Sequence, residues 1–551
     1  MSQPVPLLSA NREVLSRPIA QDKLVIAHYM TGMLPTPSGE FGWIDPARYD
    51  PNGFTSAAGG LYQTIPVISL HAGSREGLAD PETAALFEMR AAKTLGIDGF
   101  NFYYPLGPDK AFRDRYDEYI VAFFAAAAEH GLDFKLTLCL APYGHGDKDA
   151  FAKAEIYAEH LNGLLEQTDR SSNWLRTPDG RLLIYTWLAD AFVSSDFDGR
   201  HWEIGEQPEL LQTVATALDH MGSLAGEKDI AVIYHLDQPD VDGLVAEALK
   251  HFPAVYGWCE TGADRMQRRR EVAALAEQVG RTYVPEVHAD YYTSKVYAKG
   301  EQAQIFDVER VLEIGTSGIE RRVQVMGLTQ TFREKLKIAI DIDAPIISYT
   351  SWNDYPEGHH LAPEINHNFG FAVMLREYLR QWRGGNPEKP GYDALAVYFK
   401  KYPSDAMPSG HSVAVRTKQT VGPATADDGI DVLVIAQEQS ILRVDGLDPQ
   451  IVPAGVRVLR LPMRPGPVRV SLARGTASVA SLVTPEWITQ APYRTDRLTY
   501  SFSSEFERYF GEIFGEAPRH TSMEYAEDEL GRPNWMSGVS TRLERQVWGG
   551  R

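Results

Sequence analysis

A repeating alternation of short apolar runs, polar loops and helical stretches extends from about residue 24 to residue 385. Eight of the runs have the length and composition of buried strands. Strands that alternate with helices and are apolar enough to be buried on both faces are typical of a parallel sheet. Eight such units predict a (β/α)8 TIM barrel, an α/β fold. The runs are 24–29, 99–104, 134–140, 182–187, 230–235, 254–258, 282–287 and 346–349.

The intervening segments carry helix signals. Residues 81–95 begin with Pro and Glu, and residues 112–129 repeat apolar side chains every three or four positions. Gly96 and Gly131 follow these segments, where helix C-caps belong. A doubly wound open sheet is the alternative, but no GxGxxG pattern follows the first run.

The pattern changes after about residue 385. Gly384, Gly385, Asn386 and Pro387 resemble a linker, and short segments with period-two alternation follow at 412–416, 430–435, 456–461 and 468–472. Such segments, separated by turn residues, predict a small β-sandwich. The expected organisation is an N-terminal extension (1–23), a catalytic barrel (24–385), a β-sandwich accessory domain (386–500) and a C-terminal extension (501–551).

Composition limits the partners. The 551 residues include 54 basic and 74 acidic side chains, for a net charge of −20. Binding to nucleic acid or to an anionic membrane surface requires a basic field, so both are excluded as partners. A neutral carbohydrate substrate is compatible with this charge. The oligomeric state stays open.

Targeting and cysteine signals are sparse. Residues 1–6 show neither a basic n-region nor an apolar h-region, and the longest notable apolar run, 120–128, is too short to span a membrane. The sequence as given is therefore expected to be cytoplasmic, or secreted if a signal has been removed. Cys139 and Cys259 both follow apolar runs and are expected to be buried, although one disulfide stays possible. Without a CxxC pair a thiolate zinc site is not expected.

Residues 348–360, at the end of the last strand run and directly after it, contain a dense group of acidic, amide, imidazole and aromatic side chains. Asp354 and Glu357 lie three residues apart, with Trp352, Tyr355 and His359 beside them. Glycoside hydrolysis needs one acid to protonate the leaving oxygen and a second to activate water or attack the sugar. Aromatic faces stack on sugar rings. Asp354 and Glu357 are therefore the predicted catalytic pair, with Glu357 as general acid and Asp354 as general base.

Polar or aromatic residues close nearly every run, as expected for a cleft at the C-terminal ends of barrel strands. Tyr143, His145, Trp187, Asp190 and Asp290 also lie at these ends. Trp352, Tyr104 and Trp258 are expected to stack on sugar rings, and Asn353, His359 and His235 to bind hydroxyls. The substrate-binding candidates are His28, Asn101, Tyr103, Tyr104, His235, Asp237, Trp258, Glu260, Glu286, His288, Trp352, Asn353 and His359.

Structural interpretations remain open for several candidates. Glu260 could pair with Arg265, and Glu286 with His288 could form a structural pair. His359 and His360 are adjacent, and adjacent side chains rarely converge on one ion. No metal and no cofactor are therefore predicted, and without a GxSxG motif a serine nucleophile has no support.

Residues 352–359, WNDYPEGH, resemble the WNDYGESH signature of glycoside hydrolase family 71, the α-1,3-glucanases or mutanases. Residues 25–30, 92–100 and 396–403 are similar to further segments of that family. The resemblance implies a (β/α)8 barrel followed by a β-sandwich, with Asp354 and Glu357 as the catalytic pair. A more distant resemblance to the family 99 endo-α-mannosidases rests on the ExxE pair of their corresponding loop.

The resemblance implies an inverting glycoside hydrolase that cleaves an α-linked glycan such as an α-1,3-glucan. Two positions depart from the signature: Pro356 stands where Gly is usual, and Gly358 where Ser is usual. A non-catalytic carbohydrate-binding protein, or a transglycosylase or lyase acting on a modified glycan, are the alternatives.

Overall fold

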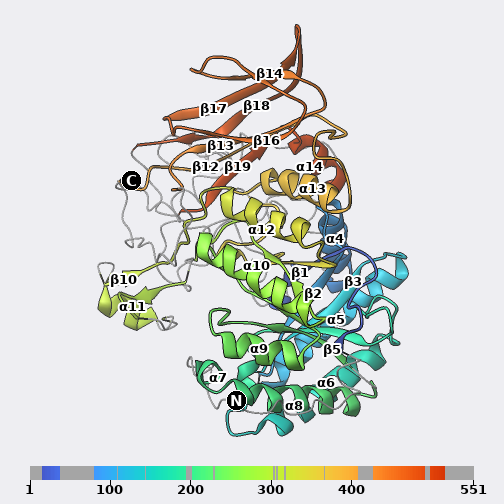
Figure 1. The fold of residues 1–551 in the computed structure, drawn as a ribbon. Helices are drawn as coiled ribbons and strands as arrows, with labels where there is room; N and C mark the ends of the chain where they lie inside the picture. Colours follow the sequence, from blue (N-terminus) through green and yellow to red (C-terminus); the bar gives the residue numbers. More distant parts are fainter. Residues whose placement is uncertain are drawn as a thin grey trace.

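The computed structural model describes residues 15–36, 78, 80–107, 109–142, 144–193, 202–227, 230–293, 295–301, 305, 308–315, 318–364, 366–406, 426–490 and 497–515. The β-rich domain, orange to red in Figure 1, stacks on one side of a larger α/β domain.

The α/β domain is built on a nine-stranded parallel sheet of order β7-β6-β5-β4-β3-β2-β1-β11-β8. The terminal strands of this order, β7 and β8, are separated in sequence only by Pro285, which donates no backbone hydrogen bond. They are therefore two halves of one interrupted strand. The sheet closes into the predicted eight-stranded barrel. The strands are β1 (Leu24–Tyr29), β2 (Gly99–Pro105), β3 (Lys135–Ala141), β4 (Leu182–Thr186), β5 (Ile230–His235), β6 (Ala254–Tyr256), β7 (Thr282–Val284), β8 (Glu286–Val287) and β11 (Ile346–Tyr349).

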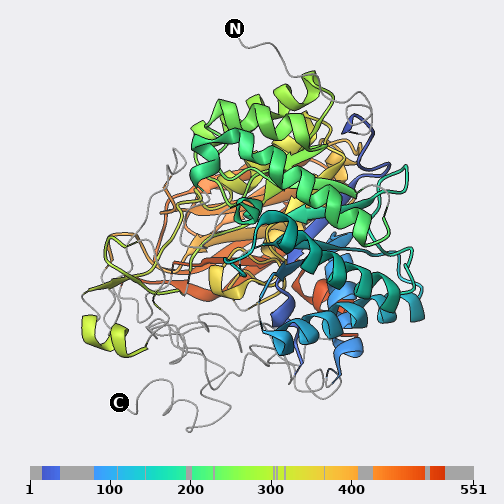
Figure 2. The same ribbon diagram turned by 90° about the horizontal axis from the view of Figure 1, so that it is seen from below.

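The helices begin and end on the expected local signals. In α4 (Pro81–Thr94) the Asp80 side chain accepts the N–H of Thr83 at 2.8 Å, and α5 covers Lys110–Glu129. Gly96 and Gly131 have φ of 96° and 59°, as the predicted C-cap positions require. Figure 2 shows the helices around the strands. The others are α6 (Ala150–Gln167), α7 (Trp202–Glu206), α8 (Leu211–Leu224), α9 (Asp242–His251), α10 (Ala263–Gln278), α11 (Val308–Ile314), α12 (Gln330–Asp341) and α13 (Gly370–Trp382).

Strand alternation produces two cores. Ile26, Cys139, Tyr185 and Ile233 belong to a cluster formed almost entirely by strand residues, which fills the barrel interior. Strand residues whose side chains point to the outer face of the sheet, such as Phe100, pack with helix residues in a larger cluster between the sheet and the helices. The face on which a side chain lies therefore decides whether it can reach the centre of the barrel.

The β-rich domain contains two four-stranded antiparallel sheets, of order β16-β13-β12-β19 and β15-β14-β17-β18, with a shared apolar core. Three of the predicted segments form β13, β16 and β17, while 412–416 lies outside the described residues. The strands are β12 (Ala394–Lys400), β13 (Ile430–Ala436), β14 (Ser440–Val444), β15 (Gln450–Val452), β16 (Gly455–Leu461), β17 (Gly466–Arg474), β18 (Ala477–Ile488) and β19 (Thr499–Ser503). β19 crosses the expected boundary at residue 500, and α14 (Phe506–Phe514) follows it.

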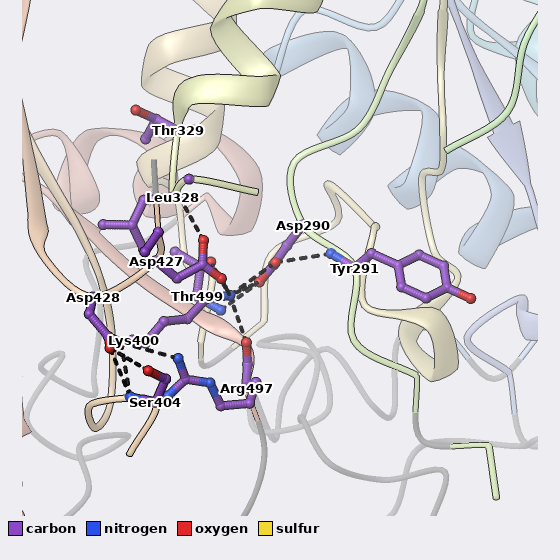
Figure 3. Close-up of polar contacts among 12 residues, drawn as sticks. Asp290, Tyr291, Leu328, Thr329, Lys400, Ser404, Asp427, Asp428, Arg497 and Thr499 are labelled. Carbon is purple, nitrogen blue, oxygen red and sulfur yellow. Dashed lines mark hydrogen bonds and ion pairs between the residues drawn. The ribbon is translucent and has the colours of Figure 1, made fainter. Parts of the chain in front are cut away.

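Buried polar contacts join the two domains. Asp290, beyond β8, accepts hydrogen bonds from Lys400 Nζ at 3.1 Å and from the N–H of Thr499 at 2.6 Å, as Figure 3 shows. At a second point Thr329 Oγ1 donates to Asp431 at 2.5 Å. Because all of these groups are buried, the sandwich is held against the barrel by specific contacts.

Cys139 and Cys259 are buried free thiols, as predicted. Within the described parts of the chain, no helix combines the length and apolar character needed to cross a membrane.

Candidate active site

The loop after β11 carries Asp354 and Glu357 on one tight turn. A 3-10 helix covers Tyr355–Glu357, and the Asp354 carboxylate accepts the N–H of Glu357 at 3.2 Å. Gly358 follows with φ of 71°, and a Cβ there would lie 2.7 Å from the carbonyl oxygen of Tyr292. The glycine that departs from the WNDYGESH signature is thus required by this backbone.

The two carboxylates converge on one imidazole. His359 Nε2 lies 3.2 Å from Glu357 Oε2 and 3.8 Å from Asp354 Oδ2, and one oxygen of each acid lies within 4.8 Å of the other. The side chains of Asp354 and Glu357 are 10% and 16% exposed. His359 Nδ1 lies 3.1 Å from Ser351 Oγ, which also accepts the N–H of Asp354 at 2.9 Å. The cluster is nearly buried but still reaches the surface.

Lys295 separates the charge states of the two acids. Burial alone would raise the pKa of Glu357, but the ion pair with Lys295 and the contact with His359 hold it well below its usual value. Burial and the negative charge of Glu357 raise the pKa of Asp354. The two shifts run opposite to the expected roles, since they favour the ionised form of Glu357 and the protonated form of Asp354.

Half-buried aromatic rings border the cluster from four strand ends. Tyr103 on β2 lies 6.0 Å from Trp187 after β4, and Trp187 lies 6.0 Å from Trp258 after β6. The Trp258 ring lies 6.2 Å from the His359 ring, and the ring of Tyr291, after β8, lies 5.9 Å from it. We call these four residues the aromatic wall. Their partial exposure allows them to contact a bound molecule.

Three polar candidates lie beneath the wall. His28 Nδ1 lies 2.8 Å from Asn101 Oδ1, and burial lowers the pKa of His28 to about 3, so the ring is neutral at pH 7. The His28 ring meets Trp258 edge to face at 4.8 Å. His235 lies 6.2 Å from the same tryptophan. The structure therefore brings His28, Asn101 and His235 together with the catalytic cluster.

Two other candidates, Trp352 and Tyr104, point elsewhere. Trp352 is 1% exposed, and its indole N–H donates to Glu88 on α4 at 2.5 Å, so its ring lies in the outer core. Tyr104 is 2% exposed and donates to Asp117 on α5 at 2.5 Å. Neither residue is placed as the expected stacking platform: strand alternation turns Tyr104 toward α5, and the loop after β11 places Trp352 against Glu88 of α4.

The side chain of Asn353 is hydrogen-bonded to the backbone of Met30. Its side-chain oxygen accepts the N–H of Met30 at 2.8 Å, and its amide nitrogen donates to the Met30 carbonyl at 3.3 Å. Asn353 is 1% exposed, so the expectation that it binds a sugar hydroxyl does not match its geometry. It ties the catalytic loop to the end of β1.

Glu260, Glu286 and His288 belong to a buried charge network. Arg269 donates to Glu260 at 2.8 Å and to Glu286 at 2.7 Å, so Glu260 pairs with Arg269 rather than with Arg265. Lys335 Nζ lies 2.6 Å from both Glu286 and His288. Burial would raise the pKa of Glu286, but Lys335 and the other cations keep it well below its usual value. Glu286 and His288 therefore have the geometry of the structural pair, not of residues facing a ligand.

The remaining strand-end residues are scattered. Asp237 is half-buried near Asp190, and Asp190 accepts the hydroxyl of Tyr234, which lies in the outer core. His145 lies in the loop after β3, and Tyr143 falls outside the described residues. None of these contacts joins the Asp354–Glu357 cluster.

Sequence reasoning missed Tyr291 and Lys295. Tyr291 follows Asp290 directly, and an aromatic residue at a strand end was a signal that could have identified it. Its N–H donates to Asp290 at 2.9 Å while its ring points away from the contacts between the domains, as Figure 3 shows. Lys295 lies in a loop without a motif, so only the folded chain shows its contact with Glu357.

Two carboxyls whose pKa values are shifted in opposite directions, with one oxygen of each within 4.8 Å of the other and half-buried aromatic rings beside them, can perform acid-assisted displacement at a sugar carbon. Two surface hollows formed by described residues lie elsewhere: one is lined by Pro81 and Asp114, the other by Leu24 and Lys135. Neither contains a comparable combination of paired acids and aromatic rings.

No protein-family model matches the chain, and no curated protein matches it. Solved structures are similar at a low level. The endo-α-mannosidase of glycoside hydrolase family 99 from Bacteroides thetaiotaomicron has 13% identity and a TM-score of 0.41, over 66% of this chain and 98% of that one. A glycoside hydrolase-like protein has 11% identity and a TM-score of 0.41, over 69% and 97%.

A family 2 glycoside hydrolase from Bacteroides cellulosilyticus has 11% identity and a TM-score of 0.38, over 84% of this chain and 46% of that one. The resemblance to family 71 is not confirmed by these comparisons. Similarities this low assign neither a family nor an activity, so the functional conclusion rests on the residues of this chain.

Proposed function

We propose that this protein is a glycoside hydrolase that uses Asp354 and Glu357 as its catalytic pair. The observation that carries the proposal is the opposite direction of the two pKa shifts in neighbouring acids at the C-terminal end of β11. Two titratable groups whose surroundings separate their pKa values are suited to distinct acid and base roles. The position at the C-terminal ends of barrel strands supports the same proposal.

In the proposed mechanism Asp354 donates its proton to the glycosidic oxygen as the bond breaks. Glu357, kept ionised by Lys295, attacks the anomeric carbon or directs a water molecule to it. The bound of 4.8 Å joins one oxygen of each acid and is not the separation of the carboxyl groups, which is roughly 6.5–9.5 Å in inverting enzymes and roughly 5–5.5 Å in retaining ones. The proposed outcome is therefore the inversion that the sequence resemblance implies.

The proposed substrate is a neutral α-linked glycan, such as an α-1,3-glucan. The aromatic wall offers ring faces to apolar sugar faces, and the buried His28, Asn101 and His235 lie beneath it. The net charge of −20 disfavours a polyanionic glycan. The α linkage itself rests on the resemblance of residues 352–359 to the family 71 signature.

The test is product release from α-1,3-, α-1,4- and α-1,6-glucans and α-mannan. Cleavage of one member, abolished in both Asp354→Asn and Glu357→Gln, is the expected result. Asp405→Asn and Glu438→Gln are matched controls, because both residues are exposed on the sandwich. Retention of most activity in either catalytic variant would overturn the proposed pair.

A non-catalytic carbohydrate-binding protein is the second candidate, because the same wall could hold a sugar without cleaving it. Calorimetric titration of the unmodified protein with the same panel distinguishes the two. Binding with unchanged ligand after long incubation supports the second candidate, and binding followed by product release supports the first.

A further inference from the structure

Three buried side chains that the proposed reaction does not use converge just beyond the catalytic loop. His360 Nε2 lies 3.5 Å from Glu364 Oε1, and His367 Nδ1 lies 3.3 Å from the same oxygen. The three side chains are 0%, 0% and 3% exposed, and one donor atom of each lies within 4.8 Å of the others. His359, one residue before this group, faces the catalytic acids instead.

The approaches of the imidazoles are not hydrogen bonds. Both ring nitrogens of His360, and Nδ1 of His367, have no hydrogen-bond partner among the residues that the structure describes. Burying a polar nitrogen without a partner is costly, so each such atom in a folded protein calls for an explanation. An ion bound between these nitrogens and the carboxylate would provide one.

Asp290 holds the His367 ring at the nitrogen that does not approach Glu364. His367 Nε2 lies 3.3 Å from Asp290 Oδ2, and Asp290 also accepts hydrogen bonds from Lys400 and Thr499 (Figure 3). The other ring nitrogen, Nδ1, lies on the side of Glu364. A histidine fixed by a second carboxylate is typical of metal ligands.

The spacing fits a tetrahedral ion. Zinc–nitrogen bonds of about 2.0–2.1 Å place neighbouring donors about 3.3–3.4 Å apart in a tetrahedron. Glu364 Oε1 lies 3.5 Å from His360 Nε2 and 3.3 Å from His367 Nδ1. The comparable group of Cys259, Glu286 and His288 already contains the ammonium of Lys335, which leaves no place for a second cation.

We propose that His360, Glu364 and His367 form a binding site for one divalent transition-metal ion, with zinc the best fit to the two imidazoles and one carboxylate. Three protein donors leave one position for water. The ion would stabilise the segment that carries His359, because all three ligands belong to that segment. This proposal departs from the expectation of no metal, which considered only the adjacent pair His359 and His360 and not the grouping of His360 with His367.

The test is metal content, measured by mass spectrometry on tag-free protein after dialysis against metal-free buffer. About one equivalent per chain is expected in the unmodified protein, and far less in His360→Gln and His367→Gln. His130→Gln, at the exposed end of α5, is the matched control and should retain the metal. His359→Gln should retain it too, which separates this site from the catalytic cluster.

A second measurement covers variants that fail to fold. Unmodified protein treated with a chelator is titrated with Co²⁺, and tetrahedral binding is expected to give strong visible absorption that one equivalent of Zn²⁺ removes. Absence of native metal together with no uptake of Zn²⁺ or Co²⁺ would overturn the proposal. Full metal content in both histidine variants would also overturn it. These readouts do not depend on glycan cleavage.

Discussion

The backbone N–H of Glu357 lies 3.2 Å from a carboxylate oxygen of Asp354, so the two acids share one hydrogen-bonded turn. Their surroundings nevertheless differ. Lys295 and His359 contact Glu357, whereas Asp354 experiences burial and the charge of its neighbour. The turn fixes the positions of the acids, and the contacts from elsewhere in the barrel assign their charge states.

Substitution of each acid should affect substrates differently. Glu357→Gln should reduce kcat/KM by about 10³-fold or more on both the natural glycan and its dinitrophenyl glycoside. Asp354→Asn should cause a comparable loss on the glycan but less than about tenfold on the dinitrophenyl glycoside, because that leaving group needs no proton. Initial rates on both substrates check this. The opposite pattern would restore Glu357 as the general acid.

Replacing Lys295 should move the acidic limb of the pH–rate profile. Lys295 lowers the pKa of Glu357, so Lys295→Met should raise that pKa and shift the loss of activity at low pH toward higher pH. The profile of kcat/KM between pH 3 and pH 9 measures the shift. Lys299→Met, at an exposed position nearby, should leave the limb unchanged. If the acidic limb of the kcat/KM profile does not shift in Lys295→Met, ionisation of Glu357 does not govern that limb.

Loss of a wall residue should weaken substrate binding more than turnover. Trp258→Ala should raise KM by about tenfold, roughly 1.4 kcal/mol, because a stacking face is removed while both acids remain. Trp487→Ala is the control, since Trp487 is 43% exposed on the sandwich. Equal KM values for Trp258→Ala and the unmodified enzyme would exclude Trp258 from the binding surface.

Glu88 should make stability dependent on pH. Burial raises its pKa to about 7, although hydrogen bonds from Trp352 and Tyr29 act in the opposite direction. The folded protein therefore binds a proton more tightly than the unfolded chain, and this contribution to stability is complete below about pH 4.5 and is lost as pH rises through about 7. The loss is at most about 3 kcal/mol.

Urea unfolding of the unmodified protein and of Glu88→Gln at pH 4 and pH 8 isolates this contribution. Gln keeps an acceptor for the indole N–H but cannot ionise, so the variant should gain stability relative to the unmodified protein as pH rises. Glu82→Gln, exposed in the first turn of the same helix, controls for the substitution itself. Parallel pH dependence in Glu88→Gln and the unmodified protein would contradict the raised pKa.

The sequence by itself determined the barrel and the position of the candidate chemistry. The eight runs became the strands, because apolar composition, Pro81 at a helix start and Gly96 and Gly131 at helix ends are local signals. The spacing of Asp354 and Glu357 was likewise sufficient to put both acids on one turn, since three residues complete a 3-10 turn.

Tertiary structure decided which neighbours those acids have. Tyr103 and Tyr104 are adjacent in sequence, yet one joins the aromatic wall and the other contacts a helix, because successive strand residues face opposite sides. Lys295 reaches Glu357, and His367 reaches Asp290, only where segments after different strands meet. Charge states depend on these long-range contacts, so the sequence could identify the two acids but could not assign the proton between them.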